Sequence, residues 1–419
     1  MDEQYFDADE DSFLLRRLKD CPEIFAAISA STPAELSSQR KLREAFDDEL
    51  VRAALSVHEA RQRAADLLPA ADRLWLTRVG LEQSTAWEVA THKAKRFSQS
   101  ASVSDLCCGI GVDAAAIAEH SQVTAIDSAA AMCLRTEWNA AIWHRSEQIQ
   151  TQCADVTNMD WSDKIVHADP DRRSGRDRPT KRLELYQPSL EWMQQLTRTA
   201  AGGGIKISPA SNFLQKFPGC EIELISLKGE CREATVWFGS LAGEHAFRAT
   251  ALPAGESISA DPLSAWTNVV PAAAEYIFDP DPAIVRSGLL DVMAEQYSMQ
   301  RLDAEEEYLT GAECVTSGFV TAFRIEAVLS GNVRDLKQHL RAAPSTHYEV
   351  KCRRIPTNAD AVRRQLPTGT AAPRVIFFAR IAGRAAIVVS HRMQRPPQTV
   401  IFIPTLKDCL AQNGRLRRE

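Results

Sequence analysis

The fold of this chain is decided by Val103-Ser-Asp105-Leu-Cys-Cys-Gly109-Ile-Gly111-Val-Asp-Ala114, followed by Val123-Thr-Ala-Ile-Asp127. The two segments predict a strand, a glycine turn that opens a helix, and a second strand that ends in an acid. The backbone amides of such a turn can approach a polar ligand, and a carboxylate at the next strand end can accept hydrogen bonds from a ribose. This layout predicts an open α/β sheet that binds a ligand at the carboxyl ends of its strands.

Two kinds of cofactor use this arrangement, a dinucleotide and S-adenosylmethionine. The run from Gly109 to Ala114 satisfies the dinucleotide pattern, which is a weak signal by itself. Asp105 stands four residues before the first glycine, where it would repel a pyrophosphate but accept from the ammonium group of a methionine. The sequence therefore favours S-adenosylmethionine, with Asp105, Gly109 and Gly111 holding its methionine end.

Acids also end the next expected strands. Asp127 is placed to accept from ribose hydroxyls, and Asp155 in Cys153-Ala-Asp-Val is expected near the adenine amino group. A fourth apolar strand, Ile165-Val-His-Ala, runs into Asp169. A single Asp in such a place is more often a helix cap or a turn residue. The ordered set of four, together with the glycines, resembles a class I S-adenosylmethionine-dependent methyltransferase.

Composition sets the general class of protein. The chain has 419 residues, enough for two or three domains, and no apolar run is long enough for a bilayer span. Its first ten residues are acidic, unlike a secretory signal, so we expect a cytoplasmic protein without a membrane partner. The ten cysteines form no C-x-x-C pair and no zinc-type cluster with histidine, so no metal is expected. The oligomeric state stays open.

Charge is unevenly distributed along the chain. The formal net charge is −6, yet the residues from Arg341 onward hold 15 Lys and Arg against 4 Asp and Glu. This basic C-terminal part indicates an anionic partner, with nucleic acid the leading candidate. The alternative is a basic face that balances acidic neighbours or serves self-association.

The pattern along the chain predicts four parts. Residues 1–75 are expected to form a helical domain, because apolar residues recur at spacings of three and four. Residues 76–250 are expected to form the cofactor domain, which ends in a β-hairpin. A linker rich in Ala, Pro, Gly and Ser is expected over 247–260, before an α+β domain over 265–395 and a basic tail over 396–419.

The chemistry is expected in Asp169-Pro-Asp-Arg-Arg-Ser-Gly-Arg176, directly after the fourth strand. Amino-methylating enzymes of this class hold an exocyclic amine with an Asp/Asn-Pro-Pro-aromatic turn. Asp169 and the carbonyl of Pro170 match the first half of that turn and are the predicted catalytic residues. Arg172, Arg173 and Arg176 are predicted to contact substrate phosphates, the alternative being a solvated loop.

Covalent methylation at a pyrimidine C5 atom would need a cysteine nucleophile after the fourth or fifth strand. No cysteine follows the fourth strand before Cys220, and the fifth strand is followed by Ser208, which is a poor substitute for a thiolate. This mechanism is therefore disfavoured.

Further motifs resemble a bacterial family of class I methyltransferases with a C-terminal THUMP-like domain. They are Leu81-Glu-Gln-Ser84, Asp105-Leu-Cys-Cys-Gly-Ile-Gly111, Asp169-Pro-Asp-Arg-Arg173, Ser226-Leu-Lys-Gly-Glu-Cys-Arg-Glu233, Phe278-Asp-Pro-Asp-Pro-Ala-Ile-Val-Arg-Ser-Gly288, Glu307-Tyr-Leu-Thr310 and Lys351-Cys-Arg-Arg354. The resemblance implies an α/β fold with a Rossmann-like, seven-stranded and mostly parallel sheet, a helical N-terminal domain and an α+β THUMP-like C-terminal domain. Because THUMP domains accompany RNA-modifying enzymes, it also implies an RNA substrate.

The combined prediction is an S-adenosylmethionine-dependent methyltransferase that acts on RNA, at a base nitrogen. Three alternatives stay open. The enzyme could methylate a protein or a small molecule, or the chain could be a non-catalytic RNA-binding protein that keeps the cofactor fold. An NADP-linked oxidoreductase is disfavoured by Asp105 and by the missing signs of a hydride-accepting site.

Overall fold

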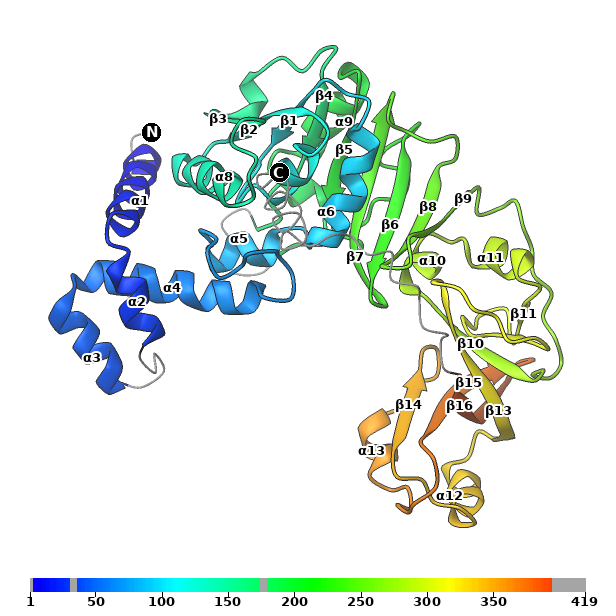
Figure 1. Ribbon diagram of the computed structural model, residues 1–419. Helices are drawn as coiled ribbons and strands as arrows, with labels where there is room; N and C mark the ends of the chain where they lie inside the picture. Colours follow the sequence, from blue (N-terminus) through cyan, green and yellow to red (C-terminus); the bar gives the residue numbers. More distant parts are fainter. Residues whose placement is uncertain (1–2, 31–35, 174–178, 394–419) are drawn as a thin grey trace, which may run out of the picture. The chain divides into compact units, whose positions relative to one another are not determined.

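The computed structural model describes residues 3–30, 36–173 and 179–393, so the predicted basic tail lies outside the described residues. The chain divides into two compact units (Figure 1). The larger unit comprises the residues up to 266 together with 281–296, and the smaller unit comprises 267–280 and the residues from 297 onward. No described helix is long and apolar enough to cross a membrane.

The larger unit is built on a sheet with the strand order β3-β2-β1-β4-β5-β7-β6-β8-β9. The strands are β1 (Ser102–Leu106), β2 (Gln122–Asp127), β3 (Ile149–Cys153), β4 (Ile165–Ala168), β5 (Gly202–Ile207), β6 (Glu221–Leu227), β7 (Glu230–Gly239), β8 (Phe247–Leu252) and β9 (Glu256–Ala260). The first five run parallel, and β7 is antiparallel to both β5 and β6. The seven strands from β3 to β6 confirm the predicted class I sheet with its terminal hairpin.

The expected linker over 247–260 is wrong, because this segment forms two further strands. β8 pairs parallel to β6, and β9 pairs antiparallel to β8. Ala249 and Ala251 are buried, and the short helix α10 (Pro282–Arg286) packs on β6, β7 and β8. The Ala-rich composition suggested a linker, but small side chains also suit a strand that a helix approaches closely.

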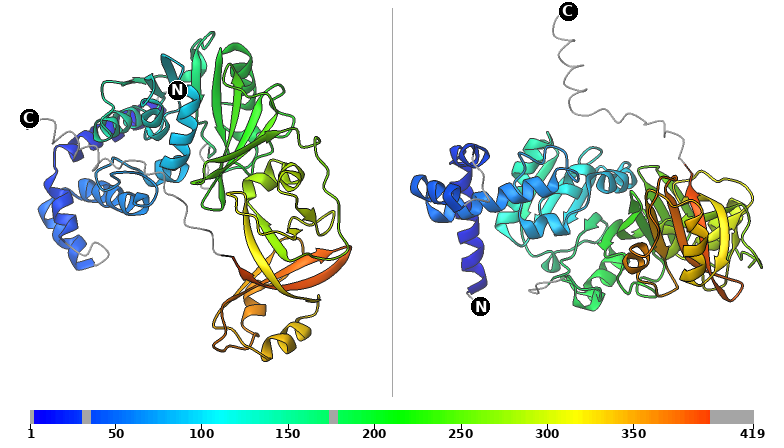
Figure 2. Two further views of the ribbon diagram at one scale, coloured as in Figure 1. Left: turned by 45° about the vertical axis from the view of Figure 1, so that its right-hand side comes forward. Right: turned by 90° about the horizontal axis from the view of Figure 1, so that it is seen from below.

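Helices pack around this sheet, and the first of them precede it in the chain. They are α1 (Glu3–Lys19), α2 (Glu23–Ser29), α3 (Leu36–Ala45), α4 (Asp48–Ala64), α5 (Arg78–Gln83), α6 (Trp87–Ala94), α7 (Val112–Ile117), α8 (Ala130–Ile142), α9 (Leu190–Thr199), α10 and α11 (Leu290–Gln296), with 3₁₀ turns η1 (Lys95–Phe97), η2 (Val156–Asn158) and η3 (Leu183–Leu185). The helices α1–α4 confirm the predicted helical start of the chain. Leu15 of α1 packs on Leu134 and Trp138 of α8, so the helices join the same unit as the sheet (Figures 1 and 2).

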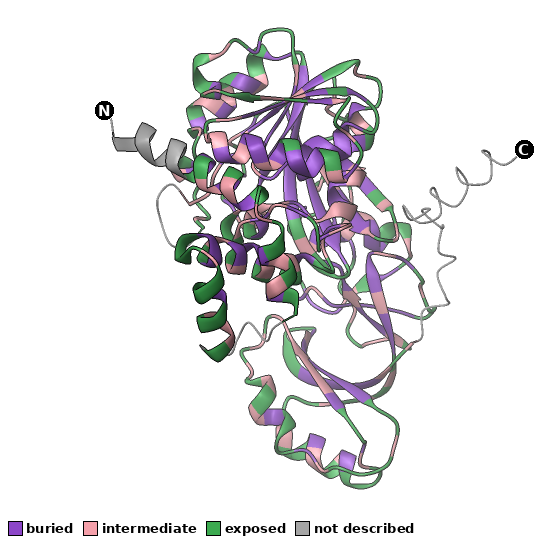
Figure 3. Cartoon of the chain, turned by 60° about the vertical axis from the view of Figure 1, so that its left-hand side comes forward, coloured by how far each residue is buried: buried purple, intermediate pink, exposed green. Residues whose placement is uncertain are grey.

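The core of the larger unit lies in its central strands, which are buried almost throughout (Figure 3). The triple glycine of β5 reflects close packing there. A Cβ atom added at Gly203 would lie 2.2 Å from the carbonyl oxygen of Val166 and 2.7 Å from the ring of Phe238. Only glycine fits at this position, because the neighbouring strand and the aromatic ring already fill the space.

A buried acid on β6 makes the stability of this unit sensitive to acid. Glu223 is fully buried and accepts from the ring Nε2 of His92 (2.8 Å), from the indole of Trp237 (2.7 Å) and from the hydroxyl of Thr250 (2.6 Å). Burial alone would raise the pKa of Glu223, but the hydrogen bonds and the charges of His92 and Arg96 outweigh it and lower the pKa to about 2.

We expect stability to be lost as the pH falls from about 4.5, the ordinary pKa of a glutamate, towards 2. The reason is linkage: a group with a depressed folded-state pKa contributes stability above its unfolded pKa, and this contribution disappears as the carboxylate is protonated. The melting temperature of Glu223→Gln should be lower than wild type at neutral pH but should change less over this acid range. A pH series of thermal melts checks this, and parallel curves for the two proteins would contradict it.

The smaller unit contains a second sheet with the strand order β11-β12-β10-β13-β16-β15-β14. The elements are β10 (Tyr276–Pro280), β11 (Gln300–Arg301), β12 (Leu309–Gly311), β13 (Val320–Ser330), α12 (Val333–Arg341), β14 (Tyr348–Cys352), α13 (Ala359–Arg363), β15 (Arg374–Ile381) and β16 (Arg384–Arg392). Leu336 and Leu340 of α12 and Val362 of α13 share one core cluster with β15 and β16, so both helices cover one face of the sheet. The expected α+β character of this region is confirmed.

Candidate cofactor and acceptor site

The glycine turn and the four predicted acids meet at one edge of the larger sheet. The strands β3, β2, β1 and β4 are parallel neighbours, so their carboxyl ends lie side by side. Burial raises the pKa of the Cys107 thiol well above its ordinary value, and the nearby charges of Asp127, Asp169, Asp105 and Asp155 raise it further. All four acids therefore surround the turn that contains Cys107.

The turn itself needs its glycines for conformational reasons. Gly109 and Gly111 have φ angles of +56° and +82°, which glycine adopts without strain. A Cβ atom at Gly109 would meet nothing within 4 Å, so this side of the turn faces open space. A Cβ atom at Gly111 would lie 2.8 Å from the side chain of Thr136, so this glycine is needed for packing.

Asp105 combines burial with an unsatisfied oxygen. Its side chain is 1% exposed, and its Oδ1 lies 2.6 Å from Nδ1 of His167 on β4. Its Oδ2 is buried and has no hydrogen-bond partner among the described residues. Burial raises the pKa of Asp105 although the bond to His167 opposes this effect. An unpaired buried carboxylate oxygen is costly, so it is an expected place for a positively charged ligand group.

His167 belongs to a buried polar network behind Asp105. Lys93 of α6 has its Nζ 3.4 Å from Nε2 of His167, 2.9 Å from Asp113 and 2.6 Å from Glu233. Burial would lower the pKa of His167, but Asp113 and Asp105 outweigh it and raise the pKa above its ordinary value, so the ring donates from Nδ1 to Asp105. Thr85 completes the network by donating to Asp113 at 2.6 Å.

The network carries more negative than positive charge. Asp105, Asp113 and Glu233 bring three carboxylates, Lys93 brings one ammonium group, and the ring of His167, whose pKa is raised, is the second group that can carry positive charge. Such a site favours a cationic ligand group and opposes a pyrophosphate. The methionine ammonium of S-adenosylmethionine therefore fits the unpaired oxygen of Asp105, and a dinucleotide does not.

Asp127 and Asp155 also make local hydrogen bonds. The two oxygens of Asp127 accept from the amides of Gly109 (3.0 Å) and Ala129 (2.9 Å), so this acid shapes the glycine turn as well as facing the ligand edge. Burial raises the pKa of Asp127 although these bonds oppose it. Asp155 is exposed and caps the turn η2 by accepting from the amide and hydroxyl of Thr157. Carboxylate oxygens accept more than one hydrogen bond, so both residues keep capacity for a ligand.

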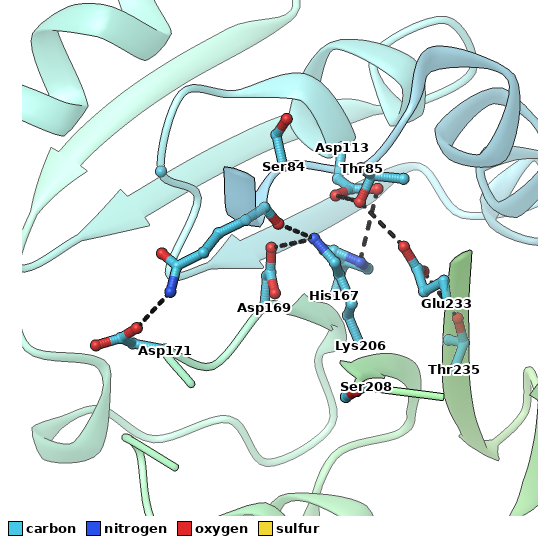
Figure 4. Close-up of polar contacts among 12 residues, drawn as sticks. Ser84, Thr85, Asp113, His167, Asp169, Asp171, Lys206, Ser208, Glu233 and Thr235 are labelled. Carbon is cyan, nitrogen blue, oxygen red and sulfur yellow. Dashed lines mark hydrogen bonds and ion pairs between the residues drawn. The ribbon is translucent and has the colours of Figure 1, made fainter. Parts of the chain in front are cut away.

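The segment after β4 forms the second half of the site (Figure 4). Lys206 of β5 donates from Nζ to Oδ2 of Asp169 (2.7 Å) and to the main-chain carbonyl of Gln83 (2.6 Å). The side chain of Gln83 in turn donates to Asp171 at 2.7 Å. Gln83, the last residue of α5, therefore helps to hold the turn that begins at Asp169, through both its carbonyl and its side chain.

The predicted substrate arginines divide into three cases. Arg172 is half-buried. Burial raises the pKa of Tyr186, and the positive charge of Arg172 opposes this effect. The hydroxyl of Tyr186 accepts from the amide of Ser208. Arg173 forms an ion pair with Glu82, which also pairs with Arg78 at 3.0 Å. Arg176 lies outside the described residues.

Sequence reasoning missed Lys93, His167 and Lys206. His167 contacts the predicted acid Asp105, Lys206 contacts the predicted acid Asp169, and Lys93 lies behind His167. A signal for two of them was present, because His167 and Lys206 interrupt apolar strand patterns. A polar side chain inside a buried strand requires a partner. The partners were not predictable, because they lie on other elements.

The expected basic C-terminal part is largely neutralised within its own unit. Of the ten Lys and Arg between 341 and 393, the seven that pair with carboxylates are Lys351, Arg353, Arg354, Arg363, Arg374, Arg380 and Arg392. Most of the acids precede residue 341, for example Asp279, Glu307 and Glu326. Over 267–280 and 297–393 together, 14 Lys and Arg face 11 Asp and Glu. The charge asymmetry was therefore real along the chain but small in the folded unit.

A sheet of this strand order, with a glycine turn after β1 and acids at the carboxyl ends of β1 to β4, defines a class I S-adenosylmethionine-binding α/β protein. The comparisons with known proteins agree. A family profile described as THUMP domain-like matches residues 320–392. An S-adenosylmethionine-dependent methyltransferase from two strains of Mycobacterium tuberculosis is 32% identical over 332 residues, which is 77% of this chain and 89% of the relative. The chain belongs to this family of S-adenosylmethionine-dependent methyltransferases.

Among solved structures, a protein described as a methyltransferase from Porphyromonas gingivalis W83 has the same fold. The TM-score is 0.69 with 15% sequence identity, and the match covers 94% of this chain and 100% of that chain. The enzyme class, the cofactor and the class I fold predicted from the sequence are thus confirmed, as is the THUMP-like domain. S-adenosylmethionine supplies a methyl group carried on a sulfonium.

Proposed function

We propose that this methyltransferase acts on RNA and that the acceptor is an exocyclic amine of a base. The observation that carries the choice of acceptor is a pair of unused oxygens after β4. Oδ2 of Asp169 accepts from Lys206, whereas its Oδ1 takes no hydrogen bond from the described residues. No described amide donates to the carbonyl of Pro170 either. Two adjacent acceptors match the two N–H groups of an exocyclic amine.

In this proposal, Asp169 and Pro170 position the acceptor. When both N–H groups are held, the nitrogen can accept the methyl group only through its lone pair. Orientation of this kind is the main contribution of an enzyme to an in-line transfer. Lys206 keeps the carboxylate of Asp169 in one orientation, because its ammonium also donates to the carbonyl of Gln83.

The proposed cofactor-binding roles follow from the positions of these residues at the carboxyl ends of the strands. Asp105 would hold the methionine ammonium, Gly109 and Gly111 would let the chain approach the methionine end, Asp127 would bind the ribose and Asp155 the adenine edge. Arg172 and Arg173 would contact phosphates of the substrate, and the same role is proposed for Arg176. The THUMP domain-like match supports an RNA substrate, because resemblance to methyltransferases with THUMP domains implies RNA modification.

The decisive experiment uses radiolabelled S-adenosylmethionine and total RNA from a strain that lacks the gene. We expect label in RNA and an N-methylated nucleoside by mass spectrometry. Label in protein or in small metabolites, with none in RNA, would support the protein or small-molecule alternative. Cofactor binding with no transfer to any cellular fraction would support a non-catalytic RNA-binding protein.

Asp105→Asn is expected to raise the Kd for S-adenosylmethionine about 10- to 100-fold, since a hydrogen bond to a charged group contributes about 1.5–3 kcal/mol. The amide can still accept from His167 through its oxygen, but it then presents its NH₂ group to the ligand ammonium. Isothermal titration calorimetry measures the change. Asp160→Asn is a suitable control, because Asp160 is exposed and bonds only Ser162 in the described structure. Equal affinity of both variants would refute this role of Asp105.

A further inference from the structure

A second cation-lined site lies in the N-terminal helices of the larger unit. A cavity of about 250 Å³ opens between α4 and α5, which contact each other (Figure 1). It is lined by Arg52, Leu55, Ser56, Glu59, Ala60 and Arg63 of α4 and by Arg78 of α5. We call this site the arginine pocket. It holds three guanidinium groups and one carboxylate, and two of the guanidinium groups also pair with carboxylates outside the lining, Arg52 with Asp48 and Arg78 with Glu82.

The amphipathic pattern of α4 produces this pocket. Leu50, Val51, Ala54 and Val57 are buried in the core of the helical region. The pocket residues Arg52, Ser56, Glu59 and Arg63 recur at spacings of four, three and four, which places them on one stripe of the helix surface. Three of these four side chains are charged, and the stripe is turned away from that core.

Arg61 differs from the pocket arginines in its contacts. This residue also lies on α4, yet its guanidinium donates to the carbonyls of Leu74 (2.8 Å) and Arg73 (3.0 Å) and lies over the ring of Phe25. Arg61 therefore stabilises the fold. Arg52 instead forms an ion pair with Asp48 in which the two side chains are 67% and 53% exposed. An exposed pair of this kind contributes little and exchanges readily for another anion.

An ion-pair chain links the pocket to the proposed acceptor site. Glu82 pairs with Arg78 of the pocket at 3.0 Å and also with Arg173 of the turn after β4. The hydrogen bonds from the two arginines lower the pKa of Glu82, so it stays ionised between them. One carboxylate thus connects the arginine pocket to the turn that starts at Asp169.

We propose that the arginine pocket binds a backbone phosphate of the RNA substrate, at a nucleotide separate from the methylated base. This inference rests on the proposed RNA substrate and adds where the strand is held. Guanidinium groups bind phosphate oxygens in a bidentate manner, and several around one cavity suit a phosphate better than a carboxylate-bearing peptide.

The test compares binding of a labelled single-stranded RNA oligonucleotide to wild type and to Arg52→Ala/Arg63→Ala over about 50–200 mM salt. We expect affinity at low salt to fall about 10-fold per arginine, and the slope of log affinity against log salt to decrease by about 1 per arginine. The Kd for S-adenosylmethionine should not change. Glu59→Lys should act in the opposite direction and tighten RNA binding.

Two controls separate this inference from the proposed function. Arg40→Ala removes an arginine that is 84% exposed and pairs with Glu44 on α3, outside the pocket. If RNA is methylated but the double variant has the affinity and salt slope of Arg40→Ala, the pocket is not a phosphate site and the proposed function stands. If the wild type neither binds nor methylates RNA, the proposed function itself fails. Arg78 is left unchanged, because its partner Glu82 also holds Arg173.

Discussion

Asp169→Ala is expected to lower the rate of methyl transfer to RNA by about 10²–10³-fold or more, while S-adenosylmethionine still binds. In the proposed geometry the carboxylate holds one N–H of the acceptor, and its loss removes orientation of the nucleophile without touching Asp105 or the glycine turn. Single-turnover rates with labelled S-adenosylmethionine measure the first effect, and calorimetry measures the second.

The matched control for Asp169 is Asp171→Asn in the same turn. The amide of Arg173 (2.9 Å) and the side chain of Gln83 (2.7 Å) both donate to Oδ1 of Asp171. An asparagine oxygen can keep both bonds, so this variant should stay within a few-fold of the wild-type rate. Asp169→Ala with a rate near that of Asp171→Asn would contradict the proposed role. Loss of cofactor binding together with activity would instead indicate a structural role for Asp169.

Lys93→Met is expected to destabilise the larger unit by about 3–5 kcal/mol, which is the usual cost of leaving buried charges without their partner. The Lys93 side chain is 1% exposed and bridges Asp113 and Glu233. Burial would lower the pKa of Lys93, but the two carboxylates outweigh it and raise the pKa above its ordinary value. Removing this ammonium leaves two buried carboxylates facing each other.

The pH dependence has a definite sign. Burial would raise the pKa of Asp113, but Lys93 and its other neighbours lower it, so its contribution is present at neutral pH and lost as the pH falls below about 4. The raised pKa of Lys93 means that its contribution is present below its ordinary pKa of 10.5 and is lost only in strong alkali. The destabilisation by Lys93→Met should therefore be largest near neutral pH and smaller in acid.

Urea unfolding curves at several pH values measure this effect. Lys95→Met, two residues further on and exposed, should change the free energy of unfolding by no more than about 0.5 kcal/mol. Adding Asp113→Asn and Glu233→Gln to Lys93→Met should recover much of the loss, because the uncompensated charges are then gone. If Lys93→Met were as stable as Lys95→Met, the network would contribute nothing to stability.

The cofactor and the mostly parallel character of the sheet were predictable because they depend on local patterns. A strand, a glycine turn and a strand-end acid are encoded within a few residues each, and parallel strands bring such ends to one edge. The strands β8 and β9 were not predictable, since β8 forms by pairing with β6 and β9 by pairing with β8, whereas their composition suggests a linker. The charge of the C-terminal part was counted along the chain, whereas in the described residues Asp279, Glu307 and Glu326 pair with some of its cations in space.

The sequence therefore identified which residues stand at the ligand edge, because their positions follow from strand order and chain direction. Which of their atoms are available was decided only by the tertiary structure. Asp105 keeps one unpaired oxygen because His167, 62 residues away, takes the other. Asp169 keeps one because Lys206, 37 residues away, takes the other. Hydrogen-bond capacity depends on neighbours from distant segments, and only folding brings those neighbours together.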